Sequence, residues 1–304
     1  MPAPKRTPKA TILVEFSYDG CRFHGLQCQP GLTTVAGALL DYLEQQLAQP
    51  LGAQSFAART DAGVSAEQNF LTLRVSATAD LTQRLARLQG RSPTKGLWIL
   101  RAASVPRSVN ARNCAVSKRY RYAIQDESGE SGERLDLGVP DGRFGRLLGA
   151  THALPAAATR ALPAEANVSE ATAGPWRVAQ RLDVSRMQDA SKMLIGTHDF
   201  SSFRARGCAA KSPVKTLHSL NVERRENQIT IDVTGDAFLR KMVRIICRCL
   251  TEVGAGLRTP SEIEGALRHP QPTPCTRPAP ARALTLLQVV MKRFEDVRDH
   301  PRYR

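Results

Sequence analysis

A run of β-branched and apolar residues near the start of the chain, TILVEFSY at residues 11–18, predicts a β-strand. A helical pattern follows, because apolar residues recur every four positions up to Leu47 and Thr33 or Thr34 can serve as the N-cap. Pro50 ends the pattern, since proline cannot continue a helix. The first part of the chain is therefore expected to form a strand and an amphipathic helix.

The next segments complete a unit in which strands and helices follow the order βαββαβ. Strands are expected at residues 54–58, 69–75 and 97–102. Leucines at helical spacing predict a second helix over residues 81–88. This order is the pattern of ferredoxin-like folds.

The same order recurs later in the chain. Alternation places Tyr120 and Tyr122 on one face of a strand over residues 117–125 and Arg119 on the other face. Further strands are expected at 214–224, 228–234 and 283–291, and further helices at 184–195 and 238–253. We therefore expect an α+β protein whose two ferredoxin-like (βαββαβ) halves join in one mostly antiparallel sheet, because joined edges leave fewer bare strands.

This interpretation divides the chain into five parts. They are a basic flexible N-terminal arm (1–10), an N-terminal ferredoxin-like half (11–125), an insertion rich in Gly, Ala, Pro and Ser (126–175), a C-terminal ferredoxin-like half (176–294) and a charged tail (295–304). The arm is either flexible or part of an organelle-targeting segment, because it lacks the apolar region of a secretory signal. The insertion has no clear periodicity, which is typical of a flexible loop or of a segment ordered by a partner.

The charge of the chain indicates what kind of molecule it binds. Its 304 residues include 43 Lys and Arg against 28 Asp and Glu, a formal net charge of +15. A surplus of this size favours polyanions such as nucleic acids. No stretch approaches the ~20 apolar residues of a membrane-spanning helix, so no membrane partner is expected.

The cysteines indicate a reducing environment. All seven are scattered, without a C-x-x-C pair, which argues against a zinc site and against a disulfide framework. We expect reduced thiols in an intracellular, reducing compartment, with the cytoplasm as the first choice and the nucleus or an organelle matrix as alternatives.

The segment RTDAGV, from Arg59 to Val64, lies between two predicted strands, where a loop can hold reactive groups on a rigid scaffold. One interpretation is a capped turn in which Gly63 supplies a positive φ. The other makes Asp61 a carboxylate for nucleophilic or acid–base chemistry, kept ionised by a nearby arginine. The loop alone leaves both interpretations open.

Other short motifs accompany this loop in order along the chain. They are YDG (18–20), FHGLQ (23–27), QP (29–30), KRYRY (118–122), GTHDFSSFRA (196–205), FLRKMVR (238–244) and EVG (252–254). Together with RTDAGV they resemble the TruA family of pseudouridine synthases, over most of the chain outside the insertion. The resemblance implies an isomerase that detaches uracil from its ribose in structured RNA, tRNA above all, rotates the base and reattaches it through C5. It implies no metal, ATP or organic cofactor.

The resemblance also implies three catalytic residues. Asp61 matches the catalytic aspartate of the family, whose carboxylate forms a covalent adduct at ribose C1′ or at C6 of the base. Arg244 matches the arginine that pairs with this aspartate. Tyr120 matches the tyrosine that stacks on the flipped uracil and helps to remove the C5 proton. We expect these residues in a catalytic RNA cleft between the two halves.

Further residues are expected to bind the substrate. Arg59 matches the arginine that occupies the space left by the flipped nucleotide. Arg119, Lys241 and Arg204 are expected to contact RNA, and Tyr120 binds the base as well as acting in catalysis.

Helical spacing places four basic residues on one side of the predicted helix at 238–253. They are Arg240, Lys241, Arg244 and Arg248. Taken alone, such a stripe is typical of a solvated helix face. With the resemblance, we expect Arg244 to be buried beside Asp61 and the other three residues to lie near phosphate.

Three residues that invite a chemical role are expected to be structural. His24 and His198 titrate near neutral pH when unperturbed, but the family chemistry assigns neither of them a proton transfer. Tyr122 shares the aromatic face of the strand and is expected to lie in the core.

Two residues depart from the family pattern, and the insertion leaves the identity of the RNA open. Ala58 stands where many members have Gly, and Ser65 stands where they commonly have His. rRNA is the alternative substrate, and the resemblance to bacterial members implies a homodimer. Two other hypotheses remain: a non-catalytic or moonlighting RNA-binding or ribosome-assembly factor with the synthase fold, and a ferredoxin-like RNA-recognition module.

Overall fold

The computed structural model describes residues 9–126 and 174–292. Residues 1–8 of the predicted arm, residues 127–173 of the predicted insertion and the predicted tail at 295–304 lie outside the described residues. Among the helices that the structure describes, none has the length and apolar composition needed to cross a bilayer.

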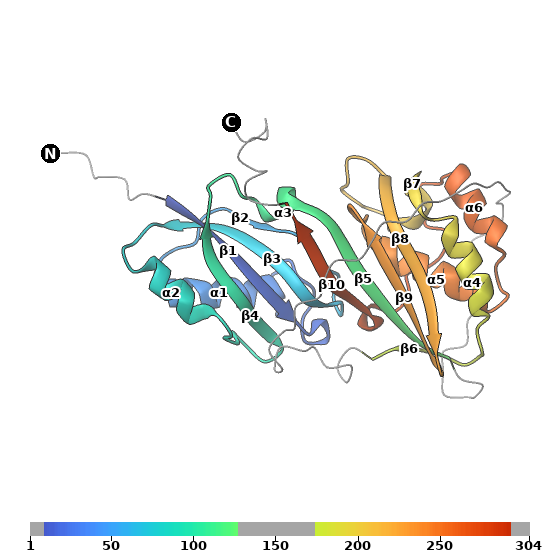
Figure 1. Cartoon of the computed structure of the whole chain (residues 1–304), viewed down its shortest axis with the longest axis horizontal. Helices are drawn as coiled ribbons and strands as arrows, with labels where there is room; N and C mark the ends of the chain where they lie inside the picture. Colours follow the sequence, from blue (N-terminus) through green and yellow to red (C-terminus); the bar gives the residue numbers. More distant parts are fainter. Residues whose placement is uncertain (1–8, 127–173, 293–304) are drawn as a thin grey trace. The chain divides into compact units, whose positions relative to one another are not determined.

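The described residues divide into two compact units (Figure 1). The first unit comprises residues 9–116 and 286–292, and the second comprises residues 117–126 and 174–285. Strands are mostly antiparallel in both units, and helices accompany them in both, so the mixed α and β composition predicted for the fold is confirmed.

The first unit is built around β1 (Lys9–Tyr18), which pairs antiparallel with β3 (Ser65–Ser76) and with β4 (Leu97–Val105). β2 (Gln54–Phe56) pairs antiparallel with β3. β10 (Leu284–Met291), of which residues 286–291 belong to this unit, follows β3 in the strand order. The strands expected at 54–58, 69–75 and 97–102 are therefore present with shifted ends.

Two helices of the first unit lie where the leucine spacing predicts them, and a short third helix was not predicted. They are α1 (Val35–Leu47), α2 (Leu81–Leu88) and the short α3 (Ala111–Cys114), with a 3-10 turn, η1 (Gly20–Arg22). The Thr34 hydroxyl caps α1 by accepting a hydrogen bond from the Gly37 N–H at 3.2 Å. α1 ends at Ala48, whose backbone is left-handed (φ 49°), two residues before the predicted stop at Pro50.

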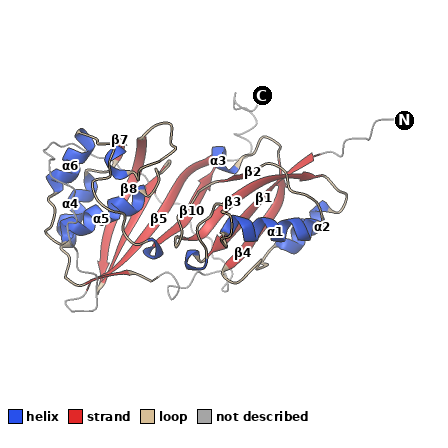
Figure 2. Cartoon of the chain, turned by 180° about the vertical axis from the view of Figure 1, so that it is seen from behind, coloured by secondary structure: helices blue, strands red, loops and turns tan. Residues whose placement is uncertain are grey.

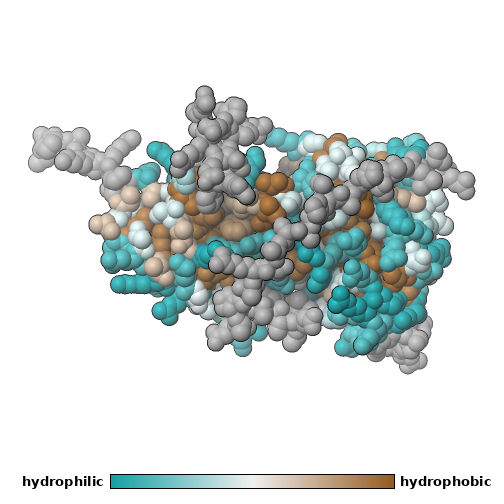
Figure 3. Space-filling model, in the orientation of Figure 1, coloured by the Kyte–Doolittle hydropathy of each residue, from teal (hydrophilic) through white to brown (hydrophobic). Residues whose placement is uncertain are grey.

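The second unit contains four antiparallel strands in the order β5, β9, β8, β7. Their bounds are Ala115–Asp126 for β5, Val214–Arg225 for β8, Gln228–Gly235 for β9 and Gly196–Asp199 for β7. The strands predicted at 214–224 and 228–234 are confirmed as β8 and β9, which form a hairpin with Glu226 in a left-handed conformation (φ 55°) at its turn. Every second residue of β9 is buried, and Figure 3 shows mainly hydrophilic side chains over β8 and β9.

Three helices pack together in the second unit, beside β7 and β8 (Figure 2). They are α4 (Val184–Lys192), α5 (Met242–Gly254) and α6 (Pro260–Arg268). Two further 3-10 turns are η3 (Ser201–Phe203) and η4 (Ala281–Ala283). The sequence patterns did not predict α3, α6 or two short strands, β7 and β6 (Trp176–Val178), of which β6 pairs parallel with β5. Strands of three or four residues are too short to show a period.

The helix predicted over 238–253 begins only at Met242, so its predicted start was wrong. Lys241, the residue before it, has a left-handed backbone (φ 61°), which an α-helix cannot contain. The Arg240 carbonyl instead accepts a hydrogen bond from the Ala205 N–H at 2.9 Å, outside any helix. The helix predicted over 184–195 likewise ends early, at Lys192.

Candidate active site

The RTDAGV segment forms a tight turn between β2 and β3. The Asp61 carbonyl accepts a hydrogen bond from the Val64 N–H at 3.2 Å, and Gly63 has a φ of 81°. This is the third position of a four-residue turn, where a positive φ favours glycine. The predicted role of Gly63 is confirmed. The side chain of Asp61 is partly exposed and that of Arg59 is exposed.

Asn69 on β3 holds the start of this loop. Its Oδ1 accepts a hydrogen bond from the Ala58 N–H at 3.2 Å, and its Nδ2 donates to the Ala58 carbonyl at 3.0 Å. Oδ1 also accepts from the Phe70 N–H at 2.9 Å. Asn69 is fully buried, so water cannot take the place of its amide as the hydrogen-bond partner of these main-chain groups. Ala58 has no positive φ, which explains why alanine can replace glycine there.

Tyr18 at the end of β1 contacts the loop one residue before Asp61. Its hydroxyl lies 2.7 Å from Thr60 Oγ1, and the Leu26 N–H donates to the Thr60 carbonyl at 3.2 Å. Burial raises the pKa of Tyr18 to about 12, although hydrogen bonds with Thr60 and Asn69 act in the opposite direction. The phenol is therefore neutral at physiological pH.

Two glycines allow the preceding segment to approach the loop closely. A Cβ at Gly20 would lie 2.1 Å from the Val64 carbonyl oxygen, and the Gly20 N–H donates to Ser65 Oγ at 3.0 Å. Ser65 is fully buried, so the hydroxyl that replaces the usual histidine has a structural partner. Gly25 has a φ of 91°, and a Cβ there would lie 3.1 Å from the Ala62 N atom. The loop is thus held by hydrogen bonds and contacts from several sides.

Asn69→Ala is expected to loosen the loop. The change leaves buried main-chain groups of Ala58 and Phe70 unpaired, which we expect to lower the free energy of unfolding by about 2–4 kcal/mol. Urea denaturation measures this loss. Asn221→Ala, at an exposed position on β8, is the matched control and should change stability by less than about 0.5 kcal/mol. Equal stability of the two variants would show that Asn69 does not hold the loop.

In the second unit, Tyr120 lies on β5 with its ring largely buried. The ring meets that of Phe238 edge to face, with centroids 5.1 Å apart and an interplanar angle of 83°. Tyr122, two residues on, is fully buried, as predicted for a core residue. The arginines between and beside them, Arg119 and Arg121, are exposed on the opposite face, as the alternation predicts.

Arg119 has a carboxylate partner in the second unit. Its Nη2 donates to Asp232 Oδ2 at 2.6 Å, and Arg121 binds the same carboxylate through two hydrogen bonds of 2.7 and 2.8 Å. Burial alone would raise the pKa of Asp232, but the hydrogen bonds from Arg121 and Arg119 outweigh it and lower this pKa. The three groups together carry one positive charge. A contact between Arg119 and phosphate would therefore compete with this carboxylate.

Arg244 lies in the first turn of α5 and is half-buried. Its Nε donates to the Ala279 carbonyl at 2.7 Å, and the Ala279 N–H donates back to the Arg244 carbonyl at 3.1 Å. This reciprocal pair fixes the plane of the guanidinium, because Nε lies in that plane. A guanidinium held through Nε presents its Nη groups as a fork, the geometry that suits a carboxylate.

Basic residues gather just before the N-terminus of α5. Ala205 donates to the Arg240 carbonyl, and Arg240 Nη1 donates to the Arg206 carbonyl at 3.3 Å. The segment after η3, which begins with Arg204, therefore lies beside the residues that lead into α5. It brings Arg204 and Lys241, both predicted RNA contacts, into one region of the second unit.

Arg248 was expected near phosphate, and this prediction was wrong. Its side chain is buried, and its Nε donates to Glu252 Oε1 at 3.0 Å. The guanidinium carbon lies 5.2 Å from the centroid of the Trp176 ring, a cation–π geometry. A carboxylate one helical turn away and an aromatic ring from β6 draw this arginine into the core.

The two histidines contact their own surroundings. His24 Nδ1 lies 3.4 Å from the Thr33 carbonyl, and His198 Nε2 lies 2.9 Å from the Ile195 carbonyl. The His198 ring also meets that of Phe200 edge to face. Both rings therefore contact main-chain carbonyls nearby in the sequence, and their predicted structural role stays a prediction.

Metal-binding clusters are not found in the part of the chain that the structure describes: it contains no group of three His, Cys, Asp or Glu side chains arranged to hold an ion. The seven cysteines all lie within the described ranges and are free thiols. Cys249 and Cys275 lie close together, with their Sγ atoms 3.3 Å apart.

Comparison with known proteins places the chain in a family. A family model described as tRNA pseudouridine synthase matches residues 190–291. The tRNA pseudouridine synthase A of Geotalea uraniireducens is 31% identical over 278 residues, which cover 91% of this chain and 98% of that protein. The chain belongs to the tRNA pseudouridine synthase A family. The resemblance drawn from the motifs is confirmed, and the protein is a pseudouridine synthase, an isomerase.

Other members of the family show similar agreement over most of their length. The tRNA pseudouridine synthase A of Xanthobacter autotrophicus is 30% identical, with 93% of this chain and 99% of that protein covered. That of Nitrosococcus oceani is 33% identical, with 84% of each chain covered. Asp61 and Arg59 lie in the first unit of this synthase, whereas Tyr120, Arg119, Arg204, Lys241 and Arg244 lie in the second.

Proposed function

We propose that this synthase converts particular uridines of tRNA to pseudouridine through a covalent adduct with Asp61. The observation that carries the proposal is the rigid turn at Asp61, held by Asn69, Tyr18 and two closely packed glycines. Family membership supports the reaction, and a fixed turn supports the role of this carboxylate. A nucleophile must be held in position when the reacting atom arrives.

The reaction rearranges bonds within one nucleotide. The Asp61 carboxylate adds to ribose C1′ or to C6 of the base, and the bond between N1 and C1′ breaks. The uracil then rotates and C5 bonds to C1′, while the bond between the Asp61 carboxylate and C1′ or C6 breaks and frees the carboxylate. The proton on C5 leaves, and N1 takes up a proton. Product and substrate have the same atoms, so the balance needs no oxidant, reductant or cofactor.

Other residues assist Asp61 in this proposal. Arg244 pairs with the Asp61 carboxylate and offsets its negative charge when RNA covers the site. The Tyr120 ring, fixed by Phe238, stacks on the flipped uracil and helps to remove the C5 proton. Arg59, exposed in the loop, occupies the space that the flipped nucleotide leaves.

The proposed architecture brings these residues together. Strands in the order β4, β1, β3, β2, with the two helices that connect them, support a ferredoxin-like first half. We extend this to two such halves, at 11–125 and 176–294, that join in one sheet with the RNA cleft between them. We further propose that the protein forms a homodimer and acts in the reducing environment of the cytoplasm.

Lys241→Ala is expected to weaken RNA binding. Lys241, Arg204 and Arg119 are the proposed phosphate contacts, and one lost contact lowers the slope of log affinity against log salt by about one. The dissociation constant for tRNA, measured by filter binding between low and moderate salt, tests this. Lys95→Ala is the control, since Lys95 is exposed in the first unit, between α2 and β4. An unchanged slope for Lys241→Ala would remove this residue from the binding surface.

Tritium release tests the proposed reaction directly. Bonding C5 to C1′ expels the hydrogen on C5, so tRNA labelled with tritium at uridine C5 must lose label to water. We expect release with the wild-type protein and none with Asp61→Ala. Release from rRNA alone would reassign the substrate, and binding without release from either RNA would favour the assembly-factor hypothesis.

A further inference from the structure

The segment from Cys275 to Pro280, which we call the Arg244 strap, carries the carbonyl that binds the catalytic arginine. Ala279 within the strap accepts from Arg244 Nε and donates to the Arg244 carbonyl. The orientation of the guanidinium therefore depends on where the strap lies. The strap contains neither helix nor strand, so contacts with other segments hold it in place, among them a hydrogen bond from the Cys275 N–H to the Ser202 carbonyl at 2.7 Å.

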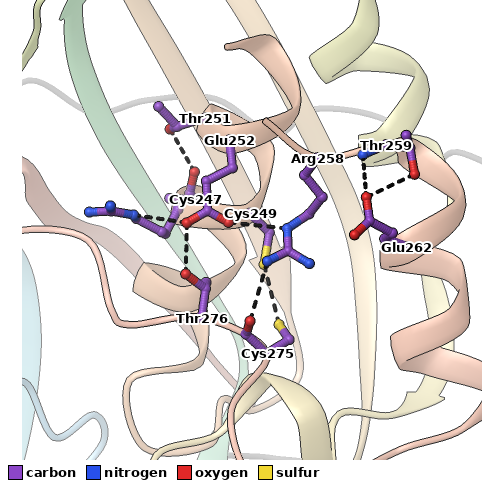
Figure 4. Close-up of polar contacts among 10 residues, drawn as sticks. Cys247, Cys249, Thr251, Glu252, Arg258, Thr259, Glu262, Cys275 and Thr276 are labelled. Carbon is purple, nitrogen blue, oxygen red and sulfur yellow. Dashed lines mark hydrogen bonds and ion pairs between the residues drawn. The ribbon is translucent and has the colours of Figure 1, made fainter. Parts of the chain in front are cut away.

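One end of the strap is bound by Glu252 of α5 (Figure 4). Glu252 Oε1 accepts a hydrogen bond from Thr276 Oγ1 at 2.7 Å and another from Arg248 Nε at 3.0 Å. Glu252 Oε2 accepts from Arg258 Nε at 3.1 Å, and Arg258 Nη2 donates to the Cys275 carbonyl at 3.3 Å. The carboxylate and its second arginine thus contact two adjacent residues of the strap.

The other end is bound by Tyr122 of β5. Its hydroxyl donates to the Pro280 carbonyl at 3.0 Å, one residue after Ala279. Tyr122 is fully buried, and its ring meets that of Trp176 edge to face at 6.3 Å. The Trp176 ring also makes the cation–π contact with the Arg248 guanidinium. Both ends of the strap are therefore fixed to one buried cluster, which consists of Tyr122, Trp176, Arg248, Glu252 and Arg258.

The buried charges of this cluster indicate a role beyond stability. Glu252 and Arg248 are each only 1% exposed, and Arg258 is 9% exposed. Burying three charged groups costs more in lost hydration than a well-packed apolar core of the same volume would. What the charged cluster provides, and an apolar one would not, is directed hydrogen bonds to the strap.

We propose that Glu252 and Tyr122 are positioning residues that fix both ends of the Arg244 strap, so that the Ala279 carbonyl holds the Arg244 guanidinium in the orientation the reaction requires. This inference rests on the proposed pairing of Arg244 with Asp61. Neither residue touches the reacting atoms. Each acts through Arg244.

Two conservative variants test this without adding an unpaired buried charge. Thr276→Val removes the hydroxyl bound to Glu252, and Tyr122→Phe removes the hydroxyl bound to Pro280. Each should lower the single-turnover rate of pseudouridine formation about tenfold and leave the dissociation constant for tRNA within twofold. Thr276→Ser, which keeps the hydroxyl, should restore the wild-type rate.

The control variant removes a similar bond from the same helix. Thr251 Oγ1 donates to the Cys247 carbonyl at 2.7 Å and is fully buried, but it does not bond to the strap (Figure 4). Thr251→Val should therefore match Thr276→Val in its loss of thermal stability and keep the wild-type rate. If the two variants lose rate equally, the strap has no positioning role.

A double-mutant cycle shows whether the effect passes through Arg244. Arg244→Lys keeps the charge but cannot make the same planar contact with the Ala279 carbonyl. In this background Thr276→Val should cost less than twofold in rate, because the orientation is already lost. A further tenfold loss would overturn the proposal.

A spectroscopic measurement separates this inference from the proposed function. If the wild-type protein makes no pseudouridine, the proposed function fails, but the strap can still be tested. The Arg244 Nε–H should exchange with water at least tenfold faster in Thr276→Val than in the wild-type protein or in Thr251→Val, as measured by NMR. An unchanged exchange rate would show that the strap does not orient Arg244.

Discussion

Asp61→Asn is expected to lower the single-turnover rate of pseudouridine formation by a factor on the order of 10⁴ or more, the scale found when a covalent nucleophile is removed. An amide is a far weaker nucleophile than a carboxylate, so no adduct with the ribose or the base can form. The turn itself should survive, because its hydrogen bond with Val64 uses the main-chain carbonyl of Asp61. Tritium release from labelled tRNA measures the loss.

The control and the affinity measurement make this prediction specific. Asp41→Asn makes the same chemical change at an exposed position on α1 and should leave the rate unchanged. The dissociation constant for tRNA should change little in Asp61→Asn, because one carboxylate contributes little to an interface dominated by phosphate contacts. Appreciable turnover by Asp61→Asn would remove Asp61 from the role of nucleophile.

Glu252→Gln is expected to lower the free energy of unfolding by about 3–5 kcal/mol, the usual cost of breaking a buried ion pair from one side. The neutral amide would leave Arg248 and Arg258 buried without a compensating charge, whereas the wild-type carboxylate accepts hydrogen bonds from both. Urea denaturation followed by circular dichroism measures the change. A total stability of only about 5–15 kcal/mol makes such a loss easy to detect.

A nearby glutamate serves as the control. Glu262 Oε2 accepts hydrogen bonds from the Thr259 N–H and hydroxyl at the start of α6, at 2.7 and 2.9 Å (Figure 4). A glutamine can still make this capping contact, so Glu262→Gln should cost less than about 1 kcal/mol. If the two variants are equally stable, the buried arginines do not depend on the Glu252 carboxylate.

Periodic segments of this chain could be predicted from the sequence, and so could the loop at Asp61. The leucines of α1 and the alternation around Tyr120 repeat often enough to show which side is buried, and Gly63 alone indicates a positive φ. The position of Arg248 could not be predicted in this way. Helical spacing gives the angle of a side chain around its own helix, but the partner that draws it inward, Trp176, lies on a strand of three residues.

The contacts of the strap could not be predicted from the sequence either. Tyr122 and Pro280 are 158 positions apart, and the proline-rich segment has no period from which its neighbours could be inferred. The late start of α5 has a similar cause: residues 238–241 have good helical composition, but the Arg240 carbonyl accepts a hydrogen bond from the Ala205 N–H in the segment after η3. Local composition cannot reveal a competing partner that is distant in the chain.

The turn at Asp61 has a consequence for how the enzyme meets its substrate. The side chains that hold it, Tyr18, Asn69 and Ser65, are neutral and come from the same unit as the loop itself. The main chain of the turn is therefore held by contacts within its own unit, independently of RNA. Under the proposed mechanism, the free energy released as the RNA docks can then go into drawing the uridine out of its stack rather than into ordering this loop.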